Sequence, residues 1–185
     1  GFDLVAEQLR IAAGEGLSAA QADIPQTGHS IELRICAEDA TADFRPSIGN
    51  ILLLDEPRGE GVRVDSGILD GGKVTTDFDP MLSKLIVHGS DRAQAIARAR
   101  HAVQNYVILG VTTNTGYLDA ILAHPDFASG DVSTGFLAEQ ADALTAPGEN
   151  VDDLLMAVAA LSDERLVAEV MQISDMHRKM GGWRN

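Results

Sequence analysis

The most regular alternation of hydrophobic and polar residues lies between positions 30 and 37. The apolar residues Ile31, Leu33 and Ile35 fall on one face of an extended chain. The other face is polar and carries Ser30, Glu32, Arg34 and Cys36. A period of two is typical of a strand that buries one face and exposes the other. The pattern therefore predicts a strand over residues 30–37, with an arginine fixed on its polar face.

Shorter apolar or alternating runs, separated by glycines, predict the other strands. They cover residues 49–56, 62–66, 73–75 and 81–88. Apolar residues at helical spacing predict helices elsewhere. These helices cover 3–13, a longer run that Ser90 or Asp91 caps, a run that Asn114 starts and Pro125 ends, and 133–144. Short, closely spaced strands favour an antiparallel meander over βαβ units, so we expect an α+β fold with flanking helices.

A change of composition near the C-terminus predicts a boundary. Residues 145–148 read Thr-Ala-Pro-Gly, which is typical of a linker. Two further helical runs follow it, at 150–161 and 163–177. The chain also begins with Gly1 in place of methionine and ends abruptly after Trp183-Arg184-Asn185. We therefore expect a helical extension after the α+β domain, and a chain that is a piece of a longer polypeptide.

The charge argues against two classes of partner. The 185 residues carry a net charge of −14. Nucleic acids and anionic membranes both require positive surface, so we expect neither as the main partner. A single cysteine, Cys36, cannot form an internal disulfide, which favours a reduced intracellular compartment. No run of apolar residues approaches the length of a membrane-spanning helix.

Two polar residues are candidates for chemistry. Arg34 stands on the predicted strand, where a rigid guanidinium can hold a small anion or a developing oxyanion. The same position also suits an ordinary solvated sheet face. Asp79 precedes Pro80, and a carboxylate there can serve a site or simply bond its own backbone in a turn. The sequence lacks the common phosphate-binding and hydrolase motifs, and its histidines have no metal-ligand spacing.

Several motifs resemble biotin carboxylases. Residues 28–39, GHSIELRICAED, are similar to the family signature G-H-A-I-E-x-R-I-N-A-E-D. Other stretches are also similar, and all of them stand in the family's order along the chain. They are LVAEQLRIAAG at 4–14, FRPSIG at 44–49, GVRVDSG at 61–67, DFDPMLSKL at 77–85, DRAQAI at 91–96 and GVTTN at 110–114. The resemblance covers the C-terminal part of that enzyme, whose ATP-gripping and metal-binding residues belong to an earlier part.

The resemblance implies a domain organisation and an activity. Residues 1–20 would be the tail of an ATP-grasp domain, 21–146 the biotin carboxylase C-terminal domain, and 147–185 a helical linker toward holoenzyme-contact and biotin-carrier regions. The parent enzyme would use ATP and bicarbonate to carboxylate biotin on its carrier. It would act within an acyl-CoA carboxylase, and the favoured subclass is the propionyl-CoA carboxylase-like α subunit. The chain alone would be inactive.

The resemblance also assigns roles to three residues and to none as a metal ligand. Arg34 matches the catalytic arginine that lies over bicarbonate and the ureido oxygen of biotin. A planar, permanently charged fork stabilises negative charge on that oxygen better than it binds neutral biotin. Asp79 matches an aspartate near the biotin pocket, where bicarbonate and biotin bind. Arg63 lies in a segment that family members use as a dimer contact.

Cofactors and partners follow from the same resemblance. They are ATP with Mg²⁺ or Mn²⁺, biotin on a carrier domain outside this chain, bicarbonate, a second copy of the chain and a carboxyltransferase subunit. The expected location is the cytoplasm, or the mitochondrial matrix in a eukaryote. A different class of function stays open, in which the chain is a non-catalytic module that supplies dimer contacts and docks subunits.

Overall fold

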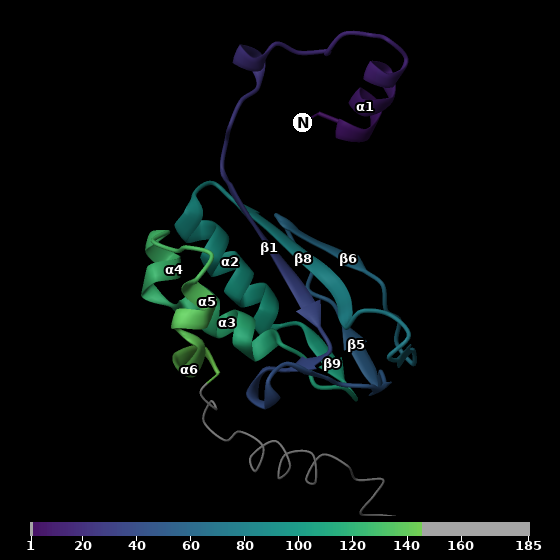
Figure 1. The fold of residues 1–185 in the computed structure, drawn as a ribbon, viewed down its shortest axis with the longest axis vertical. Coiled ribbons are helices and arrows are strands. Elements are labelled where there is room, and N and C mark those ends of the chain that lie inside the picture. Colours follow the sequence, from purple (N-terminus) through teal and green to yellow (C-terminus); the bar gives the residue numbers. More distant parts are fainter. Residues whose placement is uncertain (1, 146–185) are drawn as a thin grey trace, which may run out of the picture. The chain divides into compact units, whose positions relative to one another are not determined.

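A three-stranded antiparallel sheet is the centre of the fold (Figure 1). The chain divides into two units, Gly1–Thr145 and Ala146–Asn185, and this computed structural model describes residues 2–145. The sheet has the strand order β1-β8-β6, with β1 at His29–Cys36, β6 at Val62–Ser66 and β8 at Met81–Gly89. The antiparallel sheet with flanking helices confirms the predicted α+β class.

Strand β1 has the two faces that its sequence predicts. Ile31, Leu33 and Ile35 are buried, and Ile35 has no exposed surface. The polar residues between them, Glu32 and Arg34, are exposed. Burial of the apolar face supplies the hydrophobic free energy that fixes the register, since a shift by one residue would expose all three apolar side chains.

The order of strands in the sheet does not follow their order in the chain. β1 pairs along its whole length with β8, from His29 opposite Gly89 to Cys36 opposite Met81. The register shifts between Ile35 and Cys36, where a bulge interrupts the ladder. β6 lies on the other side of β8. The structure thus places β1 and β8 side by side, with their apolar faces in one core, although residues 37–80 separate them in the sequence.

The remaining strands form short two-stranded ladders. They are β2 (Glu38–Asp39) with β3 (Arg45–Pro46), β4 (Gly49–Asn50) with β7 (Lys73–Val74), and β5 (Leu53–Asp55) with β9 (Val107–Leu109). The single strand predicted over 49–56 is therefore two strands with different partners. Ile51 lies between them, 1% exposed, and its N–H donates to the carbonyl of Gly72. The strand β9 was not predicted, because its apolar run continues the helical pattern before it.

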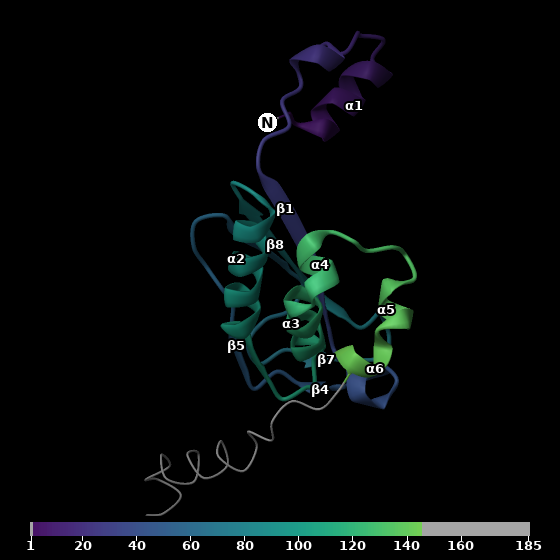
Figure 2. The same ribbon diagram turned by 90° about the vertical axis from the view of Figure 1, so that its left-hand side faces the viewer.

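Helix α2 (Arg92–Gln104) covers the inner face of the sheet (Figure 2). Asp91 caps it, as predicted, through a hydrogen bond from the Gln94 N–H. Its buried residues are Ala95, Ile96, Ala99, Ala102 and Val103. They form one hydrophobic core with the apolar faces of β1 and β8. The helix predicted from the spacing of these apolar residues is confirmed.

In the described part of the chain, four shorter helices follow α2. They are α3 (Thr115–Ala123), α4 (Pro125–Ser129), α5 (Phe136–Glu139) and α6 (Ala141–Leu144). Asn114 precedes α3 as predicted, and Pro125 both ends that helix and begins the next one. Proline suits a first helical turn because its missing N–H needs no partner there. The run predicted over 133–144 consists of two helices.

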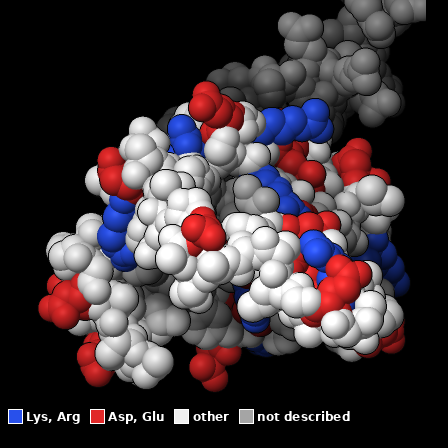
Figure 3. Space-filling model, turned by 90° about the horizontal axis from the view of Figure 1, so that it is seen from above, with Lys and Arg blue, Asp and Glu red and all other residues white. Residues whose placement is uncertain are grey.

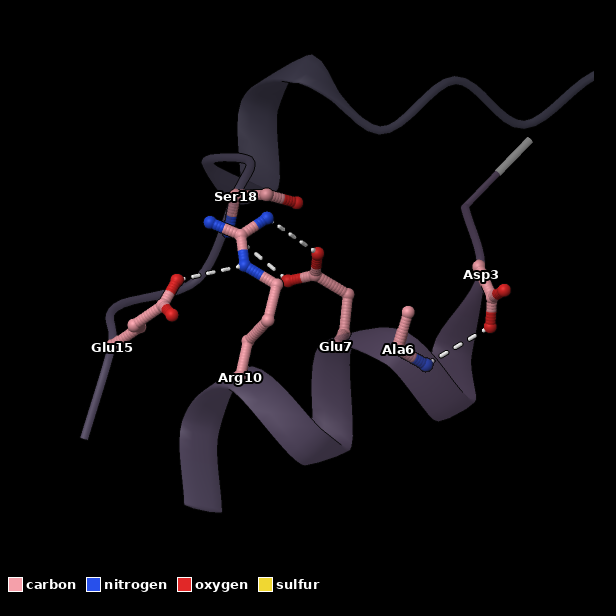
Figure 4. Close-up of polar contacts among 6 residues, drawn as sticks. All are labelled: Asp3, Ala6, Glu7, Arg10, Glu15 and Ser18. Carbon is pink, nitrogen blue, oxygen red and sulfur yellow. Dashed lines mark hydrogen bonds and ion pairs between the residues drawn. The ribbon is translucent and has the colours of Figure 1, made fainter. Parts of the chain in front are cut away.

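The N-terminal helix α1 (Leu4–Ala12) lies within the range 3–13 that the sequence predicts, and Figure 4 shows the hydrogen bond at its start. The Asp3 carboxylate accepts a hydrogen bond from the Ala6 N–H, and Gly14 follows the helix with a left-handed φ of 88°. Glu7 accepts from the Ser18 N–H and pairs with Arg10. Two 3₁₀ turns, η1 (Gln21–Asp23) and η2 (Ala40–Ala42), complete the elements of residues 2–145.

The helices predicted at 150–161 and 163–177, and with them the predicted helical extension, lie outside the described residues. Within residues 2–145, none of the helices has the length and apolar character needed to span a membrane.

Candidate functional site

The outer face of the sheet, opposite α2, presents two rows of side chains. One row runs across the three strands through Arg34, Lys84 and Asp65, which are direct neighbours in the register. The adjacent row is Glu32, Ile86 and Arg63. The sequence predicted only the polar face of β1. The sheet pairing brings Arg34 and Arg63 onto one surface.

Arg34 presents an open guanidinium. Its side chain is 74% exposed, and its Nε lies 4.0 Å from the Glu32 Oε1 atom. An exposed pair at that separation contributes little free energy, so Glu32 does not neutralise the arginine. Within residues 2–145, the guanidinium has no hydrogen-bond partner. Its donors are therefore available to an anion that approaches the outer face.

Lys84, in contrast, is held by Asp65. Its Nζ lies 3.7 Å from Asp65 Oδ2, while Arg63 Nε and Nη2 lie 2.7 and 3.1 Å from the two oxygens of the same carboxylate. The hydrogen bonds from Arg63 and the charge of Lys84 lower the pKa of Asp65. Like charges opposite each other destabilise a strand pair, and Asp65 offsets this effect between Lys84 and Arg34. The position of Lys84 in the sequence did not indicate this role.

Asp79 lies just before β8, two residues ahead of Met81, which pairs with Cys36 at the end of β1. One Asp79 oxygen accepts a hydrogen bond of 3.2 Å from the Met81 N–H, which is the turn contact that an Asp-Pro sequence favours. Burial raises the pKa of the Cys36 thiol, and the negative charges of Glu38 and Asp79 raise it further. The positive charge of Arg34 lowers the pKa of this thiol. The charges of Arg34 and Asp79 thus act in opposite directions on the pKa of the same thiol.

Two hollows lie along this end of the sheet. One, of about 250 Å³, lies between β6 and β8 and is lined by Asp65, Ser66, Gly67, Met81, Leu82, Ser83 and Lys84. The other, of about 100 Å³, is lined by Ala37, Pro46, Ser47, Ile48, Val74, Thr75, Thr76, Phe78 and Pro80. Each is small for a whole cofactor, since ligand pockets usually enclose about 300–1,000 Å³. The open outer face is therefore the larger candidate surface.

Acidic and basic side chains are interspersed on the described part of the surface seen in Figure 3. Within residues 2–145, no group of three or more His, Cys, Asp or Glu side chains is arranged to hold a metal ion. The chemistry that these residues offer is the binding of an anion by a fixed cation, with carboxylates beside it.

The comparison with protein families shows to which family the chain belongs. Residues 32–139 match the family described as the biotin carboxylase C-terminal domain. This chain belongs to that family. The matched segment contains Arg34, Arg63 and Asp79.

Individual relatives agree with this membership. A pyruvate carboxylase subunit of Methanothermobacter thermautotrophicus is 46% identical over 139 residues, which are 75% of this chain and 28% of that protein. The biotin carboxylase of Halalkalibacterium halodurans is 47% identical over 74% of this chain and 30% of its own length. The mitochondrial propionyl-CoA carboxylase alpha chain of Homo sapiens is 46% identical over 75% of this chain and 19% of its own. The chain thus spans less than a third of the length of these relatives.

Solved structures of biotin carboxylase domains have the same fold. The biotin carboxylase domain dimer of Hydrogenobacter thermophilus 2-oxoglutarate carboxylase, in complex with MgADP, ADP and bicarbonate, is 40% identical. It superimposes with a TM-score of 0.74 over 80% of this chain and 33% of that one. The biotin carboxylase subunit of a pyruvate carboxylase gives the same TM-score at 37% identity, with the same coverage.

Proposed function

We propose that this chain is the C-terminal part of a biotin carboxylase, which carboxylates biotin on its carrier with ATP and bicarbonate, within an acyl-CoA carboxylase. The family membership and the coverage of the relatives support this proposal. Residues 1–20 would then end an ATP-grasp domain, 21–146 form the C-terminal domain, and 147–185 lead toward the holoenzyme-contact and carrier regions. The similarity to propionyl-CoA carboxylase alpha chains favours an acyl-CoA carboxylase of that kind.

The open guanidinium of Arg34 is the single observation that carries the chemical proposal. It is a permanent cation on a rigid strand, with donors that the described residues leave free. When the ureido nitrogen of biotin loses its proton, negative charge develops on the ureido oxygen. A cation already aimed at that oxygen stabilises the charged state more than neutral biotin and so lowers the barrier. The same guanidinium can hold bicarbonate through two parallel hydrogen bonds.

Asp79 and Arg63 have supporting roles in this proposal. Asp79 keeps one carboxylate oxygen beyond its turn contact, and near β1 that oxygen can accept a hydrogen bond from bound biotin. Arg63 projects from the same sheet face and serves a contact between two copies of the chain. The dimer named for the Hydrogenobacter thermophilus relative supports a homo-oligomer.

ATP and its metal ion require residues beyond those described. The relative bound to MgADP supports ATP with Mg²⁺ or Mn²⁺ as part of the activity. The metal does not fit residues 2–145, which offer no cluster of ligands for it. Further partners in the proposed activity are the carrier-borne biotin and a carboxyltransferase subunit. The proposed location is the cytoplasm, or the mitochondrial matrix in a eukaryote, and the mitochondrial relatives support the second part of this proposal.

A non-catalytic assembly module is the second candidate. It is favoured by the coverage, since the chain matches only 19% of the human propionyl-CoA carboxylase alpha chain. In that case the outer sheet face would serve subunit contact alone.

The two candidates predict different enzymology for the whole gene product. We expect it to cleave ATP only when bicarbonate and free biotin are both present, and we expect this chain alone to be inactive. Phosphate release would be measured with each component omitted in turn. A gene product that binds carboxylase subunits but releases no phosphate would favour the module, and ATP cleavage by this chain alone would contradict the proposal.

A further inference from the structure

Asn114 precedes helix α3 but does not cap it. Asparagine is favoured at this position because its side chain usually accepts a hydrogen bond from an N–H of the first turn. The side chain of Asn114 makes no such bond. It is also only 7% exposed, and it is one of two buried polar residues in the described part of the chain, with Ser83. A buried amide needs partners, so its contacts indicate what it does.

The partners of Asn114 are backbone groups of β1 at and beside Arg34. Its Nδ2 donates to the Arg34 carbonyl at 3.1 Å, and its Oδ1 accepts from the Cys36 N–H at 2.9 Å. Its own main-chain N–H donates to the Cys36 carbonyl at 3.1 Å. In an antiparallel pair, alternate residues direct their backbone groups away from the partner strand. Asn114 therefore satisfies the edge of β1 that β8 leaves unpaired.

These contacts lie where the sheet itself holds β1 least well. The bulge between Ile35 and Cys36 interrupts the ladder with β8 at this point. The next residue, Ala37, is fixed on both sides, since its N–H donates to the Pro80 carbonyl and its carbonyl accepts from the Ser47 N–H, each at 2.8 Å. Asn114 thus extends the fixed backbone from Ala37 back to Arg34, across the bulge.

A fixed backbone matters for Arg34 because its exposed side chain makes few contacts of its own. Its guanidinium is at the end of a long, rotatable stem, and its nearest charged neighbour is 4.0 Å away. The direction of such a side chain depends on the position and orientation of its Cα atom. An error of about 1 Å in the placement of a reacting group can cost about a hundredfold in rate.

We propose that Asn114 is a positioning residue that aims Arg34 by clamping the edge of β1. This inference rests on the proposed function, in which Arg34 stabilises the ureido oxygen. Asn114 touches neither biotin nor bicarbonate in this proposal. It acts only through the backbone of Arg34 and Cys36.

A double-mutant cycle in the whole gene product tests this dependence. We expect Asn114→Ala to lower kcat for biotin-dependent ATP cleavage by about tenfold to a hundredfold, with little change in the KM for ATP. In the Arg34→Ala background, the same substitution should change kcat less than twofold, because the group that it aims is gone. A loss of similar size in both backgrounds would overturn the inference and leave the proposed function intact. Full activity of Arg34→Ala would overturn both.

Asn105→Ala is a matched control. Asn105 follows helix α2, is exposed, and donates from Nδ2 to the His101 carbonyl at 2.7 Å. Its replacement by alanine therefore also removes a hydrogen bond from a side-chain amide to a backbone carbonyl. Its side-chain hydrogen bonds within the described residues go to His101, not to β1. We expect its kcat to equal that of the unsubstituted protein. A loss equal to that of Asn114→Ala would mean that the effect is not specific to the edge of β1.

Amide exchange on this chain tests the clamp without any activity. The Cys36 N–H should exchange at least tenfold faster in Asn114→Ala, while the amides of α2 keep their protection. Unchanged exchange at Cys36 would overturn the inference. Asn114→Asp is a second variant of nearly the same shape, which keeps the acceptor for Cys36 and removes the donor to Arg34. It should lose kcat as well, and if both variants fail to fold, Asn114 serves folding and the inference is wrong.

Discussion

At the residue scale, Arg34 shows how strand geometry separates a charged group from the core. The neighbours Leu33 and Ile35 are buried, and they fix the strand against α2. The arginine between them points to the opposite face. An arginine in this position has a rigid base and an unneutralised head, which is the arrangement that electrostatic stabilisation of a transition state requires. The proposed site thus depends on the alternation of β1 as much as on the arginine.

Replacing Arg34 by lysine tests the two-pronged geometry separately from the charge. Lysine keeps the charge but loses the planar fork that can bind two oxygens or one oxygen in a fixed direction. We expect Arg34→Lys to lower kcat of the whole gene product by about 10² to 10³, the scale for one donor to a developing oxyanion. Steady-state kinetics with free biotin would measure it.

The control for this prediction is Arg58→Lys. Arg58 is exposed and lies away from the outer face of the sheet, in the hollow beside His101 and Asn105. Its substitution should leave kcat unchanged. An Arg34→Lys variant as active as Arg58→Lys would show that charge alone is sufficient, and the assignment of the fork would be wrong.

At the element scale, the short strands depend on contacts between segments that are distant in the sequence, and Gly110 is an example. Gly110 joins β9 to the segment before α3 with φ of +104°, where L side chains are strained. A Cβ atom on Gly110 would collide with the carbonyl oxygen of Asn50, which follows from the close approach of β4 to this segment. Local pattern alone marks Gly110 only as a residue that can end a helix. The approach of another strand is a tertiary fact that local pattern does not contain.

Two glycine substitutions should therefore have opposite effects on stability. Gly110→Ala should lower the free energy of unfolding by at least about 1–3 kcal/mol, the usual cost of a strained backbone position. Gly116 lies inside α3, is exposed, and has nothing within 4 Å of an added Cβ atom. Gly116 is the second residue of that helix, and Gly116→Ala should raise the free energy of unfolding by about 0.5 kcal/mol, because alanine restricts the unfolded chain more than glycine does.

Urea unfolding of this chain measures both changes. The two variants add the same methyl group a few residues apart, so each controls for the other. Equal effects of the two substitutions would contradict the close approach of Gly110 to β4.

At the scale of the whole molecule, the proposed function gives the outer sheet face two roles, in chemistry and in assembly. Arg34 and Arg63 lie on the same surface, in neighbouring rows on the two outer strands of the sheet. Arg63 makes two hydrogen bonds to Asp65, which hold its guanidinium in one orientation. A planar, pre-oriented arginine loses little conformational entropy when it enters an interface.

Removal of the Arg63 side chain should weaken self-association more than activity. In the whole gene product, we expect Arg63→Ala to raise the dimer dissociation constant about tenfold or more, as arginines often dominate interfaces. Sedimentation velocity over a range of concentrations would measure it, with Arg58→Ala as the exposed arginine control. An unchanged dissociation constant would remove Arg63 from the proposed contact.

Local structure and family membership could be predicted from the residues in chain order. The alternation in β1, the stripe of α2 and the Asp91 cap depend on neighbouring residues, and local physics suffices to predict them. The motif order around Arg34 indicated biotin carboxylases, and the comparisons confirm that family.

Only the tertiary structure decides which segments of the chain contact each other. The pairing of β1 with β8, the split of 49–56 into two strands, and the row from Arg34 to Asp65 all join residues far apart in the chain. Asn114 is the clearest case, since its sequence position predicts a helix cap and its side chain instead holds β1. A buried polar group takes whichever partner the packing brings within reach, and the packing is a property of the whole domain.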